Sequence, residues 1–130
     1  MDKFTEAYIE AALWSSMGDD DEPLDRNHDA SDLAPETMER ILQDCTKFQE
    51  DNAETLAECE ALDEAGDWAH SGRCSVLESA GHDLWLTRNG HGAGFWDGDW
   101  PERLDDKLDA SAKSFGEVDL YIGDDGLMYI

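Results

Sequence analysis

The chain has 130 residues, of which 33 are Asp or Glu and 9 are Lys or Arg, so its formal net charge is −24. Hydrophobic residues make up 40% and include five Trp, which excludes a disordered acidic tail and predicts one folded domain over 1–130. A field this negative excludes direct binding of nucleic acid, and the apolar runs are far shorter than the ~20 residues that a membrane span needs.

The N-terminal part, residues 1–79, is predicted to be helical. Apolar side chains at helical spacing predict a first helix over 4–17, and Gly18 is a typical residue to end it. A polar, strongly acidic loop follows and continues as far as Leu33. The acidic residues concentrate in this part of the chain, because residues 1–79 hold 22 Asp or Glu against 5 Lys or Arg.

A second helical pattern begins at Pro35, a residue that suits the first position of a helix. Its apolar stripe continues to about Ala65, with polar residues on the opposite face. Asn52 lies in the path of the stripe and is a weak helix former, so one long helix and a break near Asn52 both stay open. Residues 67–79 are predicted to hold a short helix with Trp68 packed inward.

The C-terminal part, residues 80–130, is predicted to alternate strands with one helix. Asn89-Gly90 is a strong signal for a two-residue hairpin turn, and Asp125-Gly126 is a second one. The expected elements are strands at 82–88 and 91–96, a helix at 101–114, and strands at 118–122 and 127–130. The predicted fold class is therefore α+β, a helical N-terminal half followed by a ββαββ unit with a small antiparallel sheet.

The aromatic residues of the expected first hairpin have two interpretations. Leu84 and Phe95 share one face and are predicted to be core residues. Trp85 and Trp96 share the other face, and together with Trp100 they form either an exposed contact patch or further core. Aromatic anchors are typical of interfaces, so an exposed patch would favour a protein–protein adaptor.

Three segments of the chain resemble parts of small acidic proteins of bacteriophages and prophages. These segments are YIEAALW at 8–14, GHDLWLTRNGHGAGFWD at 81–97 and YIGDDG at 121–126. The resemblance implies a phage setting and assigns no activity. In that setting a counter-defence role is expected, because several acidic phage proteins mimic DNA and block restriction enzymes, CRISPR effectors or repair enzymes.

The net charge independently supports the hypothesis of nucleic-acid mimicry. Duplex DNA carries one charge per roughly 1.7 Å, so 24 charges correspond to about 41 Å of duplex. A compact chain of this length has a diameter of roughly 36 Å. We therefore predict a nucleic-acid mimic. The candidate partner-binding residues are Asp19, Asp20, Asp21, Glu22, Asp25, Asp29, Asp32, Glu50, Asp51, Glu54, Glu58, Asp97, Asp99, Asp105 and Asp106.

The expected partner is a basic nucleic-acid-binding host protein or complex, such as a CRISPR effector or a restriction system. No basic region followed by an apolar one marks a signal peptide at the N-terminus, so a location in the host cytoplasm is expected. The sequence contains no Gly-x-Ser-x-Gly elbow or comparable catalytic motif, which predicts that the protein is not an enzyme and needs no cofactor. Whether the protein forms a homodimer stays open.

Two sets of residues carry possible metal ligands, but no metal site is predicted. Five oxygen-bearing residues occupy positions 1, 3, 5, 7 and 12 of an EF-hand-like register, namely Asp25, Asn27, Asp29, Ser31 and Glu36. Ala30 stands where that loop requires Gly, so calcium binding by residues 25–36 stays open. For zinc, the sequence lacks any Cys-x-x-Cys or His-x-x-x-His pair.

A third interpretation assigns the acidic residues no partner at all. Cytoplasmic proteins of salt-loving organisms are rich in Asp and poor in Lys, and this chain has 20 Asp and only four Lys. The charge would then serve solubility. Nucleic-acid mimicry, an aromatic adaptor and salt adaptation are thus the three hypotheses that the sequence supports.

Overall fold

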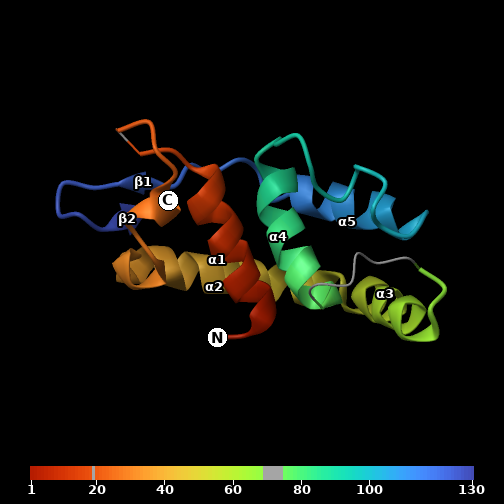
Figure 1. Cartoon of the computed structure of the whole chain (residues 1–130). Helices are drawn as coiled ribbons and strands as arrows, with labels where there is room; N and C mark the ends of the chain where they lie inside the picture. Colours follow the sequence, from red (N-terminus) through yellow and green to blue (C-terminus); the bar gives the residue numbers. More distant parts are fainter. Residues whose placement is uncertain (19, 69–74) are drawn as a thin grey trace.

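The computed structural model describes residues 1–18, 20–68 and 75–130. Within these ranges the chain is largely helical and carries one small antiparallel sheet, so the α+β class holds in its coarse form (Figure 1). The elements are α1 (Lys3–Ser15), the 3-10 turns η1 (Leu24–Arg26) and η2 (Ala30–Asp32), α2 (Pro35–Asp51), α3 (Ala53–Ala65), α4 (Val76–Arg88), α5 (Leu104–Lys113), β1 (Tyr121–Ile122) and β2 (Met128–Tyr129). Among the described helices, none has the length and apolar character needed to cross a membrane.

Helix α1 confirms the first predicted helix, although it ends at Ser15 and not at Gly18, and it packs against α4. The Asp2 carboxylate caps its N-terminus by accepting a hydrogen bond from the Thr5 N–H at 2.8 Å. Phe4 and Tyr8 are fully buried on its inner face. The two helices cross very closely, since a Cβ added to Gly81 of α4 would lie 2.0 Å from the carbonyl oxygen of Phe4. Gly81 thus allows the backbones of the two helices to approach each other.

The second helical pattern breaks at Asn52, as one of the two alternatives predicted. The Asn52 side chain is buried, and its amide nitrogen donates to the carbonyl oxygen of Phe48 and to Oγ of Ser111, both at 2.8 Å. A side chain that binds its own preceding turn in this way competes with regular helix geometry. The chain resumes as α3 directly afterwards, because the Leu56 N–H donates to the carbonyl of Asn52 at 2.8 Å.

The predicted strand over 82–88 is wrong, because these residues belong to α4. Ser75 starts this helix, its hydroxyl accepting a hydrogen bond from the Glu78 N–H at 3.1 Å. Asn89 and Gly90 then end the helix, with Gly90 in the left-handed region at φ +68°, instead of forming a hairpin turn. The expected helix at 67–79 lies partly outside the described residues.

The return strand predicted over 91–96 is also wrong, since this segment lies in the loop between α4 and α5. The loop closes onto α4 at Gly94, where an added Cβ would lie 2.3 Å from Oγ1 of Thr87. The same hydroxyl oxygen accepts a hydrogen bond from the Phe95 N–H at 3.1 Å. The ββαββ order is therefore not present among the described residues, although the helix expected at 101–114 is confirmed as α5.

The second predicted hairpin is confirmed around Asp125-Gly126. Tyr121 pairs with Tyr129 and Ile122 with Met128, in antiparallel register. Strand β2 also bridges to the chain just before α2, where the carbonyl oxygen of Met128 accepts the N–H of Ala34 and the hydroxyl of Thr37, both at 3.0 Å. The hairpin therefore holds the start of α2.

The core contains a row of phenylalanines between α1, α2 and the α4–α5 loop. Phe48 of α2 stacks on Phe4 at 5.7 Å and on Phe95 at 5.8 Å between ring centroids. Leu84 and Phe95 are fully buried, as predicted. All five helices and the α4–α5 loop thus contribute to a single hydrophobic core, and Met128 of strand β2 packs into it.

Candidate functional site

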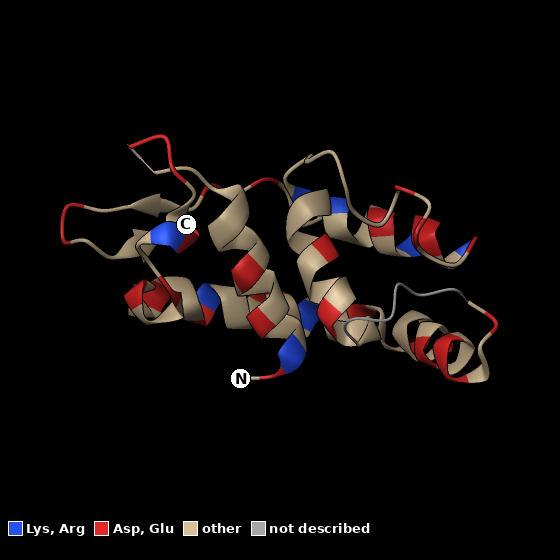
Figure 2. Cartoon of the chain, in the orientation of Figure 1, with Lys and Arg blue, Asp and Glu red and all other residues tan. Residues whose placement is uncertain are grey.

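The candidate acidic residues lie on several elements and do not form one continuous cluster (Figure 2). Asp19 lies outside the described residues. Of the other fourteen candidates, eleven are exposed, whereas Glu22, Asp32 and Asp105 are half-buried. They divide into three groups, namely the loop over 20–32, the junction of α2 with α3, and the segment that leads into α5 (Figures 1 and 2).

The junction of α2 and α3 carries the densest of the three groups. Seven carboxylates lie within residues 50–64, and this segment has no Lys or Arg. All seven are exposed. We call these residues the acidic ridge: Glu50, Asp51, Glu54, Glu58, Glu60, Asp63 and Glu64. The last three were not among the candidates, although the polar face of the helical pattern contains them.

The spacing of the acidic ridge resembles the charge spacing of one nucleic-acid strand. Fifteen residues at the rise of a helix have a contour of about 22 Å, which gives about one carboxylate per 3 Å. One strand of duplex DNA has a phosphate per 3.4 Å of axis. The ridge bends at Asn52 and its side chains point to different sides of the helix, so it matches a strand in charge density and not in shape.

The acidic ridge is only weakly neutralised by the rest of the chain. Among the described residues, Asp51 is its one member with a Lys or Arg within 4 Å, at 2.7 Å from Nζ of Lys47. The hydrogen bond from Lys47 to Asp51, together with the charge of that carboxylate, raises the pKa of Lys47. Both partners are largely exposed, and such pairs contribute little to stability. The other six carboxylates are exposed and have no basic partner among the residues that the structure describes.

A hollow of about 670 Å³ separates the acidic ridge from α5. Glu58 and Asp67 line one side of it, and Glu102, Arg103 and Lys107 line the other. Arg103 has a left-handed backbone at φ +76°, which directs the chain into α5. Neither Arg103 nor Lys107 makes an ion pair with the described residues. Their positive charges weaken the negative potential at this end of the ridge.

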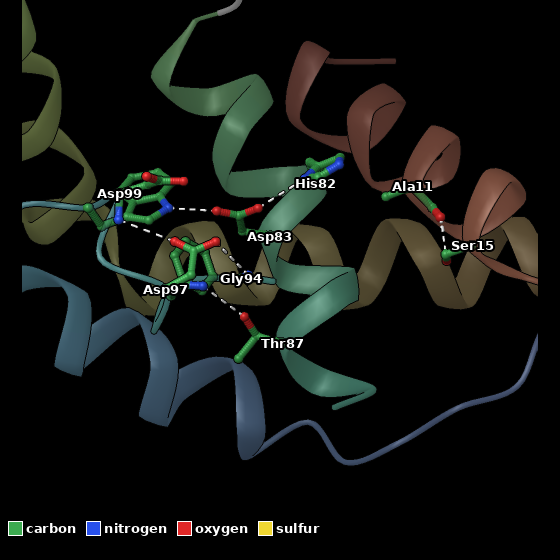
Figure 3. Close-up of polar contacts among 10 residues, drawn as sticks. Ala11, Ser15, His82, Asp83, Thr87, Gly94, Asp97 and Asp99 are labelled. Atoms are coloured by element: carbon green, nitrogen blue, oxygen red, sulfur yellow. Dashed lines mark hydrogen bonds and ion pairs between the residues drawn. The ribbon is translucent and has the colours of Figure 1, made fainter. Parts of the chain in front are cut away.

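The acidic segment before α5 has a structural role as well as an exposed surface. The two carboxylate oxygens of Asp97 accept the N–H groups of Gly94 and Asp99, each at 3.2 Å (Figure 3). On α5 itself, the Asp105 carboxylate accepts the N–H of Asp106 at 2.8 Å. These hydrogen bonds shape the backbone, while Asp97, Asp99 and Asp106 remain exposed to solvent.

The acidic loop over 20–32 is held together by its own carboxylates. Asp29 and Asp32 form a capping box around η2, in which Asp29 accepts the Ser31 N–H at 2.9 Å and Asp32 accepts the Asp29 N–H at 3.1 Å. Hydrogen bonds from Ser31 lower the pKa of Asp29. Glu22 pairs with Arg26 at 3.0 Å. These contacts stabilise the loop, and they leave fewer of its carboxylate oxygens free to bind a partner.

The structure gives the calcium hypothesis no assembled ligand set. Asp29 and Ser31 hydrogen-bond to each other, and Glu36 lies in the first turn of α2. Across 1–18, 20–68 and 75–130, no three His, Cys, Asp or Glu side chains come together at metal-binding distance. The three carboxylates of this register, Asp25, Asp29 and Glu36, therefore do not converge on one site.

The three-tryptophan patch expected for an adaptor is not formed. Trp85 is buried and donates its indole N–H to Oγ of Ser15 at 2.7 Å. Trp100 is 5% exposed and donates to Oδ2 of Asp83 at 2.6 Å (Figure 3). Only Trp96 of the three is exposed, at 51%. The interpretation of Trp85 and Trp100 as contact residues was therefore wrong.

Comparisons with protein-family models, with curated proteins and with solved structures give no match to this chain. The resemblance to acidic phage proteins therefore stays a prediction from the three sequence segments. The longest of these, 81–97, covers the second half of α4 and the loop that closes onto it, a unit in which Gly81 and Gly94 both mark close approaches.

Proposed function

We propose that this protein binds the basic, nucleic-acid-binding surface of another protein and thereby keeps nucleic acid away from it. The observation that supports this proposal best is the acidic ridge, whose seven carboxylates are all exposed and whose segment contains no basic residue. Lys and Arg side chains that grip phosphates form comparable charge-assisted hydrogen bonds with carboxylates. The protein would act by occupying the surface, without chemistry of its own.

The net charge of −24 acts together with the ridge in this proposal. A strong negative field speeds the encounter with a positively charged surface, and salt screens this effect. The binding energy would be spread over many carboxylates, so that single neutralisations have small effects and several on one face have a large one. The remaining acidic groups, on the 20–32 loop and before α5, would extend the charged surface.

The sequence resemblance suggests where such a protein would act. Small acidic phage proteins meet host systems that must hold nucleic acid in order to work, and restriction systems and CRISPR effectors are the expected targets. Both work in the host cytoplasm. The protein would resemble the nucleic acid that it displaces in charge density alone.

A displacement assay tests the proposal with two variants of equal charge. The ridge variant carries Glu50→Gln, Glu54→Gln, Glu58→Gln and Glu60→Gln. The matched control carries four substitutions at exposed positions outside the ridge, Glu6→Gln, Glu10→Gln, Glu36→Gln and Glu117→Gln. Each protein is added at low salt to a restriction endonuclease and to a guide-loaded CRISPR effector, each bound to its fluorescent cognate duplex, and release of the duplex is followed by gel shift.

We expect the wild-type protein and the control variant to release the duplex from at least one of the two targets. The ridge variant should need at least tenfold more protein, and raising the salt concentration should weaken all three. Failure of the wild-type protein to release either duplex would overturn the proposal. Equal weakening by both variants would also overturn it, because total charge and not the ridge would then decide the effect.

A further inference from the structure

We propose that Trp96 is a preformed anchor that stacks on an arginine side chain of the partner protein. This inference rests on the proposed function, and it adds a specific contact to what is otherwise a diffuse attraction between charges. It follows from the exposure of Trp96, from the rigidity of its loop and from the charge that surrounds it.

Trp96 is exposed in a loop whose other large aromatic residues are buried. Its neighbour Phe95 is fully buried in the phenylalanine row, and Trp100 is buried against Asp83. Trp96 is 51% exposed and makes no ring contact with the aromatic residues that the structure describes. An indole ring in water loses the stabilisation that burial would give, so its outward position offers a large contact area to a partner.

The loop that carries Trp96 is fixed on both sides by side-chain hydrogen bonds (Figure 3). On the N-terminal side, Thr87 of α4 accepts the Phe95 N–H at 3.1 Å. On the C-terminal side, Asp97 joins Gly94 to Asp99 through its two carboxylate oxygens, at 3.2 Å each. Little conformational entropy remains to be lost when a ligand packs on such a loop, which makes binding more favourable.

The charge around Trp96 selects a cation. The loop contains no Lys or Arg between Arg88, which is buried, and Arg103. Asp97 and Asp99 follow Trp96 in the sequence and are exposed. A cation above an indole face is attracted by the ring, and guanidinium also stacks on it as a flat group and binds carboxylates in a bidentate manner. Arginine meets these conditions better than lysine.

The Trp96 loop and the acidic ridge lie at the same end of the molecule. The indole N–H of Trp68, three residues beyond the end of α3, donates to the carbonyl oxygen of Asp99 at 2.9 Å. The hollow lined by Glu58 and Glu102 lies between the ridge and the start of α5. A basic surface that covers the C-terminal part of the ridge therefore has the loop within reach (Figure 1).

Two short peptides test the anchor directly, one of four arginines and one of four lysines. The indole N–H signals of the protein are followed by NMR during titration, and the signal that disappears in a Trp96→Ala variant is assigned to Trp96. We expect tetra-arginine to shift this signal at a concentration several-fold lower than tetra-lysine does. Equal effects of the two peptides, or no shift of this signal, would overturn the proposal.

The displacement assay supplies the second readout, with Trp14→Ala as the matched control. Trp14 is the other exposed tryptophan among the described residues, at 45%, and it stacks on His82 of α4. We expect Trp96→Ala to weaken release of the duplex about tenfold and Trp14→Ala to leave it unchanged. Because both side chains are about half exposed, circular dichroism should show both variants folded.

The two proposals fail in distinguishable ways. If the wild-type protein releases the duplex and Trp96→Ala does so equally well, the anchor is disproved and the mimicry stands. If the wild-type protein releases no duplex while tetra-arginine still shifts the Trp96 signal selectively, the proposed function is disproved and the arginine site stands.

Discussion

Nη1 of Arg88 lies 3.0 Å from Oδ2 of Asp44, and this ion pair joins α4 to α2 inside the protein. The Arg88 side chain is only 1% exposed. The same nitrogen donates to the hydroxyl of Tyr8 at 3.0 Å, while Nε and Nη2 donate to the carbonyls of Gly116 and Phe115. One guanidinium thus connects α1, α2, α4 and the turn after α5, and in a chain of net charge −24 its positive charge is held in the core.

Replacing Arg88 should therefore destabilise the whole fold. Arg88→Ala leaves the Asp44 carboxylate without its partner and several buried acceptors without a donor, and such losses cost about 3–5 kcal/mol. Urea denaturation at neutral pH measures the free energy of unfolding. Arg40→Ala is the control, because Arg40 is exposed and makes no ion pair with the described residues, and it should change stability by less than about 0.5 kcal/mol. Similar values for the two variants would contradict the structural role of Arg88.

The close crossing of α1 and α4 predicts that Gly81 cannot be enlarged. In Gly81→Ala the new Cβ would lie 2.0 Å from the Phe4 carbonyl, so the helices must separate. Overpacking of this kind costs about 1–3 kcal/mol. Gly92→Ala is the control, because nothing lies within 4 Å of its added Cβ. Thermal melts of the two variants should differ by several degrees, and equal melting temperatures would show that the crossing is looser than described.

Buried thiols predict a loss of stability at alkaline pH. Burial raises the pKa of Cys45 to about 12 from its ordinary value of 9.0, and burial also raises the pKa of Cys59. The unfolded chain ionises first, so the contribution of Cys45 is fully present below pH 9 and is lost as the pH rises from 9 towards 12. At pH 10 the loss from Cys45 is about 1.4 kcal/mol.

Urea titrations at pH 7, 9 and 10 check this prediction, with Cys45→Ala as the comparison. The variant should be less stable than the wild type at pH 7, since Cys45 fills space in the core. Its stability should nevertheless fall less steeply with pH. Parallel pH profiles for the two proteins would show that Cys45 ionises equally well in both states.

The net charge predicts that moderate salt stabilises the fold. Repulsion among carboxylates opposes compaction, and the Debye length falls from about 30 Å at 0.01 M to about 10 Å at 0.1 M salt. A gain of about 1 kcal/mol over this range would raise the melting temperature of a chain of this size by about 4 °C. The gain should level off below 0.5 M NaCl. A melting temperature that keeps rising into molar KCl would instead favour salt adaptation as the reason for the acidic surface.

Helical periodicity was sufficient to predict α1, α2 and α5, and turn chemistry was sufficient for the last hairpin. These local patterns failed to predict α4. The segment from His82 to Arg88 is rich in residues that favour strands, and it precedes the turn signal Asn89-Gly90. What makes it a helix is a cap at Ser75 and a crossing at Gly81, and the crossing depends on a helix 77 residues earlier in the chain. Local propensity does not contain that information.

The candidate site also has one part that local sequence predicts and another that depends on distant contacts. The acidic ridge could be predicted, because carboxylates at polar helical positions face solvent whatever the helix packs against. The exposure of the tryptophans could not, since Trp85 and Trp96 were assigned to one face of a hairpin that does not exist. Trp85 instead lies on α4 and donates to Ser15 of α1, whereas Trp96 lies in the loop that the hydrogen bond from Phe95 to Thr87 holds against α4.

The start of α2 has a consequence for how the chain folds during translation. Ala34 offers no side-chain cap, and the helix is instead held by the carbonyl oxygen of Met128, which accepts from Ala34 and from Thr37, 91 positions earlier in the chain. The ribosome must therefore deliver residue 128 before this end of the helix is fixed. Until then the first turn of α2 in the nascent chain is frayed, and α2 continues into the acidic ridge, where like charges repel. Both properties delay the collapse of the nascent chain.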